Sequence, residues 1–354
     1  MTVALGLAYG GSLASAYHGP AELTPAQALT SWAVDPYPLA VLAVMCALYI
    51  LGVRRVRRDG GNWPAGRIIA FCVGGAGLAF VATSSFLAVY WPVLFYVRAF
   101  QTVLLVLGVP LFIMVGRPVS LAIAASPRIG PRIEAAITGR VARVMTFPAV
   151  TALVLVLTPF VLYFSPWFGA GFHSHAVREL TYLVLVLPGL VFFWTLLRID
   201  PVPREYPYLV ALWVTAAEVV GDAALGLAVI ADHTLIAGGY YHALARPWGP
   251  SLASDQVIGG GALWVLGDII GLPFLAAVLI AMIREDESDA RVIDAALDAG
   301  EAASATTSAA EGDAQTAAAH PTAEHRLWWQ DDPRFAGRFA PVDPDAGAPG
   351  QPQR

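Results

Sequence analysis

Between Tyr37 and Ile283 the chain consists mainly of apolar stretches long enough to cross a lipid bilayer. A helix rises about 1.5 Å per residue, so roughly 20 apolar residues cover the ~30 Å hydrocarbon core. With 57% hydrophobic and 13% charged residues, the 354-residue chain does not have the composition of an ordinary soluble domain. We therefore predict an all-α, polytopic membrane protein, a seven-helix bundle in contact with membrane lipid. Its spans are approximately Tyr37–Val53, Arg67–Tyr90, Val93–Val115, Phe147–Phe164, Glu179–Leu197, Pro207–Ala231 and Ile258–Ile283.

The chain contains no lysine, so its basic residues at the ends of the spans are arginines. The distribution of these arginines predicts the orientation of the spans. Arginines gather after the first, third, fifth and seventh spans, and the opposite loops hold little beyond Arg98, Arg178 and Arg246. By the positive-inside rule the N-terminus lies outside and the C-terminus lies in the cytoplasm, as an odd number of spans requires.

The chain is expected to have three parts: an outer segment 1–36, the membrane domain 37–283 and a tail 284–354. The first 16 residues end in Ala14-Ser15-Ala16, which looks like a signal-peptidase site. They lack the positive region of a secretory signal and are too short to span. We interpret them as an outer segment, with cleavage as the alternative.

The tail is predicted to be a largely disordered cytoplasmic segment. Glu285–Asp298 could extend the last helix, whereas the low-complexity stretch Ala299–Ala319 cannot bury enough apolar surface to offset its chain entropy. Trp328 and Trp329 could dock a cytoplasmic partner, or rest on the membrane surface as interfacial aromatics.

Three carboxylate side chains lie in the predicted spans, where burial of a charged group in the bilayer costs free energy. Glu218 and Asp222 are four residues apart and share one helix face in the sixth span, and Asp268 lies in the seventh. Arg98 and Gln101 form a polar face in the third span and could supply a cation. The five residues predict either an intramembrane polar network that fixes helix packing or a proton- or ion-linked pathway.

Four of the seven histidines fall in the predicted outer loops, at His173, His175, His233 and His242. His173-Ser174-His175 could chelate copper or zinc if the segment is extended, because alternate side chains then share a face. The alternative is that these histidines are simply solvated.

The remaining candidates are small residues. Cys46 and Cys72 could form a soft Cu(I) pair between the first two spans, or could be apolar packing residues. Gly74, Gly75 and Gly77 in the second span, with Gly267 and Gly271 in the seventh, predict close helix approach.

A series of motifs in order along the chain resembles the caa3-type cytochrome c oxidase assembly factor family (CtaG), particularly its actinobacterial members. The last of them contains Trp248, Asp255, Gln256 and Trp264, followed by Gly267-Asp268. Earlier motifs include Gly116-Arg117-Pro118, Ser165-Pro166-Trp167 and Ile199-Asp200-Pro201. The resemblance implies a seven-span bacterial plasma-membrane protein that aids assembly of the haem–copper oxidase of the respiratory chain at its copper centres, with oxidase subunits as partners.

The sequence departs from this family at its intramembrane histidines. The corresponding positions hold Arg98, Thr102, Arg178, Tyr182, Val184 and Asp222. Neither arginine nor valine binds a metal at ordinary pH. A copper site of the family type is therefore not expected. If the protein handles copper, which is the one cofactor considered, the outer histidines would bind it.

The first functional hypothesis is an oxidase assembly factor that is not an enzyme, because no nucleophile–base pair or metal triad has usable spacing. The alternatives are a divergent paralogue that acts as a structural membrane partner without metal, and a proton- or ion-linked transporter that uses Glu218, Asp222 and Asp268. No basic patch is interleaved with aromatic residues, so nucleic-acid binding has no support.

Overall fold

The protein is described here from a computed structural model, which describes residues 17–204 and 206–314. These residues form helices joined by turns and contain no β-strand, which confirms the predicted all-α class. The elements of the first half are α1 (Pro25–Thr30), α2 (Pro36–Arg58), α3 (Ala65–Ile69), the π-helical η1 (Ala70–Gly77), α4 (Leu78–Ser84), α5 (Phe86–Tyr90), α6 (Phe95–Val103), the π-helical η2 (Leu104–Gly108), α7 (Val109–Val115) and α8 (Pro118–Ala125). Those of the second half are α9 (Gly130–Ile137), α10 (Arg140–Met145), α11 (Pro148–Tyr163), α12 (Pro166–His173), α13 (His175–Leu197), α14 (Tyr208–Ala231), α15 (Gly238–Leu244) and α16 (Leu252–Ala314).

Six helical runs in the described residues are long and apolar enough to cross a membrane. The pair α11 and α12, bent by 64° at a short break, makes a seventh if it is counted as one span. All seven predicted spans therefore have a counterpart. The first is longer than predicted, because Asp35 caps α2 and the helix continues through its arginines to Arg58.

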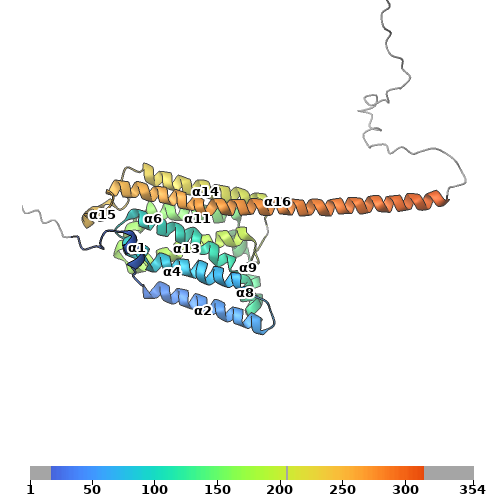
Figure 1. Ribbon diagram of the computed structural model, residues 1–354, viewed down its shortest axis with the longest axis horizontal. Helices are drawn as coiled ribbons and strands as arrows, with labels where there is room; N and C mark the ends of the chain where they lie inside the picture. The colour runs from blue at the N-terminus through green and yellow to red at the C-terminus, as the bar shows by residue number, and fades with distance from the viewer. Residues whose placement is uncertain (1–16, 205, 315–354) are drawn as a thin grey trace, which may run out of the picture. The chain divides into compact units, whose positions relative to one another are not determined.

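The described residues up to Asp286 form one compact unit, and the part of α16 beyond Asp286 belongs to a second unit. Within the first unit α13 packs against both α7 and α11, α11 packs against α14, and α2 packs against α8 (Figure 1). The third span is the most buried of the candidate spans, which places α6, η2 and α7 at the centre of the packing.

Glycines permit several of these close approaches. A Cβ atom added at Gly74 would lie 2.7 Å from the Phe112 side chain, and one at Gly75 would lie 2.5 Å from Ile113. A Cβ atom at Gly189 of α13 would overlap the Val106 carbonyl oxygen. Small residues let membrane helices approach at the level of the backbone, as predicted for Gly74 and Gly75.

A buried tyrosine joins the first three spans at the arginine-rich end of α2. This residue is Tyr49, whose hydroxyl donates a hydrogen bond to the Gly116 carbonyl oxygen at 2.6 Å and accepts one from Trp63 Nε1 at 3.1 Å. The Tyr49 ring stacks on Phe71 with centroids 3.9 Å apart. These contacts fix the register of α2 against η1 and the end of α7.

The last helix differs from the expectation for the tail. α16 continues to Ala314, so the stretch Ala299–Ala314 is helical rather than disordered. Alanine and glutamate have high helix propensity, and this local preference needs no buried core. Trp328, Trp329 and the Ala14–Ala16 segment lie outside the described residues.

Replacement of Gly189 by alanine is expected to lower the free energy of unfolding by roughly 1–3 kcal/mol, because the added methyl group overpacks the contact with the third span. Thermal unfolding of the purified protein in detergent measures the change. Gly261→Ala is the matched control, since nothing lies within 4 Å of its added Cβ atom. Equal melting temperatures for the two variants would contradict the packing account.

Candidate functional site

Four charged or ionisable side chains meet where α2 and α13 begin, and we call them the Asp35 cluster: Asp35, His175, Arg178 and Glu179. Asp35 caps α2 by accepting a hydrogen bond from the Tyr37 amide at 3.1 Å. Its other oxygen, Oδ2, lies 2.9 Å from His175 Nε2 and 2.6 Å from Arg178 Nη2. Residues 140 positions apart in the chain are thus brought into one charged group.

Glu179 completes the cluster one helical turn after His175. Its Oε1 lies 3.3 Å from Arg178 Nε and 3.9 Å from His175 Nδ1. The Asp35, His175 and Glu179 side chains each offer a ligand atom, and these atoms all lie within 4.8 Å of one another. No other group of three such residues in the described ranges meets this spacing.

The environment of the cluster is half-exposed and charged. The His175 side chain is 49% exposed, whereas that of Asp35 is 13% exposed. Burial would raise the pKa of Asp35, but the Tyr37 amide, His175 and Arg178 outweigh it and lower the pKa below its ordinary value. Asp35 is therefore an anion at neutral pH, and solvent reaches the ring of His175.

The four predicted outer histidines do not form one group. His173 ends α12, where its Nδ1 lies 3.0 Å from the Gly169 carbonyl oxygen and its ring packs near Tyr240. His233 follows α14, and His242 lies in α15. Among them only His175 lies in a group of three potential ligands within the described residues.

Arg98 lies in the packed interior, with 3% of its surface exposed. Its Nη1 donates to Gln101 Oε1 at 2.6 Å, and Gln101 Nε2 donates to the Ala82 carbonyl oxygen at 2.6 Å. The guanidinium carbon lies 5.0 Å from the Trp91 ring centroid and 5.9 Å from that of Tyr182. Aromatic faces and an amide therefore surround this charge, and within the described residues no ion pair joins it to a carboxylate.

The intramembrane carboxylates form a separate group. Glu218 and Asp222 interact directly on α14 and are 2% and 8% exposed. Their oxygens face Gly271 and Gly267 of α16, which leave room for them. Glu218 Oε1 and Asp268 Oδ1 have no hydrogen-bond partner in the described part of the chain. The five predicted network residues thus divide into an Arg98–Gln101 pair and a carboxylate group.

Two further aspartates bind helix N-termini from distant segments. Asp255 accepts hydrogen bonds from the Phe95 and Tyr96 amides at 3.1 and 2.9 Å, at the start of α6. Asp200 accepts in the same way from the Val119 and Ser120 amides at 3.2 and 2.9 Å, at the start of α8. Each carboxylate satisfies main-chain amides that the helix itself leaves unpaired.

The other motif residues also make structural contacts. Gln256 Oε1 accepts from the Ile236 amide at 2.9 Å, and its Nε2 donates to carbonyl oxygens of the segment after α14, among them that of Asp232 at 3.0 Å. A Cβ atom added at Gly226 would lie 2.7 Å from the Cβ atom of Trp264. Trp248 lies under the Arg246 guanidinium, 5.0 Å from its ring centroid. These residues hold the loops and the α14–α16 contact.

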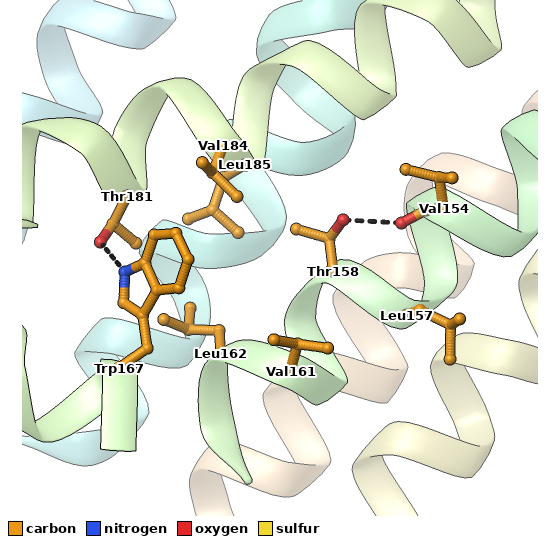
Figure 2. Close-up of a pocket in the computed structure, with 9 residues that line it drawn as sticks. All are labelled: Val154, Leu157, Thr158, Val161, Leu162, Trp167, Thr181, Val184 and Leu185. Atoms are coloured by element: carbon orange, nitrogen blue, oxygen red, sulfur yellow. Dashed lines mark hydrogen bonds between the residues drawn. The ribbon is translucent and has the colours of Figure 1, made fainter. Parts of the chain in front are cut away.

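One apolar hollow lies between α11 and α13 (Figure 2). It encloses about 220 Å³, and its polar contacts are internal: Trp167 Nε1 donates to Thr181 Oγ1 at 2.8 Å, and Thr158 Oγ1 donates to the Val154 carbonyl oxygen at 2.6 Å. No ionisable side chain lines it, so it offers no acid, base or metal ligand.

Cys46 and Cys72 are free thiols on α2 and η1. Their side chains lie close enough to interact electrostatically. The first two spans thus bring the two cysteines near each other, as the sequence allowed. Two thiols alone do not decide between packing and ligation.

A comparison with protein families identifies the chain. The model of the cytochrome c oxidase caa3 assembly factor family matches residues 47–285, which contain nearly the whole bundle. The chain belongs to this family. The suspected resemblance is confirmed, and the matched region includes Arg98, the carboxylate group, His175 and Glu179 but not Asp35.

Mycobacterial proteins are similar to this member of the family. Uncharacterized protein Mb0105 of Mycobacterium bovis and uncharacterized protein MT0111 of Mycobacterium tuberculosis are each 29% identical over 278 residues, 76% of this chain. Uncharacterized protein ML1998 of Mycobacterium leprae is 28% identical over 265 residues, 73% of this chain. The alignments cover 42%, 42% and 40% of those proteins, so the chain spans less than half their length. No solved structure matches the chain.

Sequence reasoning missed Asp35 as a potential ligand and the two capping aspartates as helix anchors. The local signal at Asp35 is the Asp-Pro pair, which is typical of a helix start with a capping carboxylate. Its contact with His175 depends on how α2 and α13 lie in space, which no local pattern reveals.

Asp255→Ala is expected to destabilise the protein by roughly 2–4 kcal/mol, because two amides of α6 and the buried Arg246 lose their acceptor. Asp232→Ala is the control, since among the described residues its carboxylate accepts hydrogen bonds only from the exposed Thr234 amide and hydroxyl. Thermal unfolding in detergent compares them. A loss as small as that of the control would show that Asp255 does not anchor α6.

Proposed function

We propose that this protein is an integral-membrane assembly factor for haem–copper cytochrome c oxidase in a bacterial plasma membrane. The carrying observation is the family match over residues 47–285, which extends across the bundle rather than over one motif. In this proposal the N-terminus faces outward and the tail faces the cytoplasm, in agreement with the distribution of arginines.

The buried polar residues support a role in binding and assembly rather than in catalysis. Arg98 is surrounded by aromatic rings and Gln101, and Asp255 and Gln256 bind main-chain groups. None of these side chains is paired with a nucleophile in the described residues. We therefore propose that the protein is not an enzyme.

Copper-centre maturation is the finer part of the proposal. The positions of the family's intramembrane histidines hold residues such as Arg98 and Asp222, so those positions do not supply imidazole ligands. The potential ligands that do lie together are at the beginnings of α2 and α13, the end of the bundle expected to face outward. The proposal accordingly places copper handling there.

Oxidase subunits are the proposed partners, and lipid-facing apolar side chains are the proposed contact surface. α2 carries several such side chains, among them Val41, Val44 and Leu48, which are 58%, 58% and 65% exposed. The tail residues Trp328 and Trp329 are proposed to bind a cytoplasmic partner. Deletion of residues 315–354 would test this last point separately.

Deletion of the gene is expected to abolish oxidase-dependent oxygen consumption of isolated membranes, and expression of the full chain in trans is expected to restore it. The physical reason is that an oxidase without a completed copper centre cannot pass electrons to oxygen. Total haem b absorbance of the same membranes is the control for respiratory chain content. Oxygen consumption equal to that of the parent strain would contradict the proposed function.

A second candidate function, proton- or ion-linked transport, rests on the unpartnered oxygens of Glu218 and Asp268. The isosteric Asp222→Asn variant distinguishes the assembly function from the transport function. In an assembly factor it keeps oxidase activity within about twofold of wild type, because asparagine preserves the packing against Gly267. Loss of oxidase activity without loss of thermal stability would favour a proton pathway instead.

A further inference from the structure

We propose that Asp35, His175 and Glu179 form a binding site for a divalent late transition-metal ion, Cu²⁺ or Zn²⁺. The proposal rests on the proposed function and deepens it, because it names the residues that would hold copper at the predicted outer end. It also departs from the His173–His175 chelate expected from the sequence. Three ligand atoms within 4.8 Å of one another need only small side-chain movements to surround one ion.

The donor set selects the class of ion. One imidazole nitrogen and two carboxylate oxygens suit Cu²⁺ and Zn²⁺, which lie at the top of the affinity order for divalent ions. Cu⁺ prefers thiolate and thioether ligands, and the cluster contains neither. Mg²⁺ prefers an all-oxygen, octahedral shell that this set does not provide.

The helices position the three ligand side chains near one another before an ion binds. His175 and Glu179 stand one turn apart on α13 and therefore share a face. Asp35 is held opposite them because its Oδ1 accepts from the Tyr37 amide, which leaves Oδ2 for the cluster. With the His175 side chain 49% exposed, an ion reaches these ligands from solvent, whereas Glu218 and Asp222 are buried.

Arg178 lowers the affinity of the proposed site for a metal ion. Its guanidinium contacts the carboxylates of both Asp35 and Glu179, at 2.6 and 3.3 Å. An entering ion competes with this cation for the same oxygens and is repelled by it. Loading and release are therefore reversible, as transfer of an ion to a partner requires. A site with three protein ligands also leaves a coordination position open for that partner.

Asp35 precedes the residues that match the family, which begin at position 47. The family match alone therefore does not account for the complete ligand set.

The test is isothermal titration of the full-length, chelator-treated protein in detergent with ZnCl₂ and separately with CuCl₂, with MgCl₂ as a control ion. One Zn²⁺ or Cu²⁺ ion per chain is expected. His175→Gln and the double variant Asp35→Asn/Glu179→Gln are each expected to weaken binding by more than about tenfold. His173→Gln is the matched control and keeps the wild-type affinity, since its ring contacts Gly169 and Tyr240 instead.

Arg178→Gln is expected to strengthen binding by about tenfold, because it removes the competing cation but keeps a side chain of similar length. A misfolded variant cannot produce such a gain. Binding that is unchanged in His175→Gln, or weaker in Arg178→Gln, would overturn the proposal.

The titration is independent of the oxidase. Absence of Zn²⁺ and Cu²⁺ binding, together with oxidase loss in the deletion strain, overturns the metal site but leaves the assembly role. Binding at this site by a protein whose deletion leaves the oxidase intact supports the metal site and removes the assembly role.

Discussion

Main-chain amides at helix starts inside a membrane protein need acceptors, because each unpaired group in hydrocarbon costs several kcal/mol. The bundle meets this constraint at its central span with carboxylates from distant segments. Asp255, at the start of α16, receives the amides of α6, and Asp200, after α13, receives those of α8. Both aspartates belong to motif stretches of the sequence, so part of the motif pattern reflects how the spans are tied together.

The remaining buried polar groups fit around this frame in two ways. Arg98 is held by aromatic rings and by Gln101, whereas Glu218 and Asp222 share the glycine-lined contact with α16. One group contains a guanidinium and the other contains carboxyl side chains, yet no ion pair in the described residues joins them. From the sequence, Arg98 could supply a cation for the carboxylates because both occur at depth, but depth does not show which faces the helices turn toward each other.

The sequence predicted the features that local pattern controls. Apolar stretches gave the second, fifth and sixth spans to within a few residues, whereas the third and seventh helical runs continue well past their predicted ends. Gly74 and Gly75 marked a close helix contact. The prediction of disorder for Ala299–Ala314 differs from the helix that the structure has there. The prediction considered that this stretch has too few apolar residues to form a core, and it left out the high helix propensity of alanine and glutamate. The Asp35 cluster could not be found from spacing, since Asp35 and His175 meet only after α2 and α13 pack.

Polar residues in this protein therefore serve two purposes according to their exposure. Those in the interior satisfy helix ends and fill helix contacts, and the half-exposed Asp35 cluster keeps its potential ligand atoms within reach of solvent. An assembly factor that handles copper needs both a rigid membrane body and an accessible, reversible ion site.

The most direct test of the central claim is the reduced-minus-oxidised haem a spectrum of membranes from a deletion strain grown with and without added copper. A copper-handling assembly factor predicts that the oxidase signal is lost on deletion and returns with excess copper or with the intact gene. An oxidase signal equal to that of the parent strain without added copper would contradict the account.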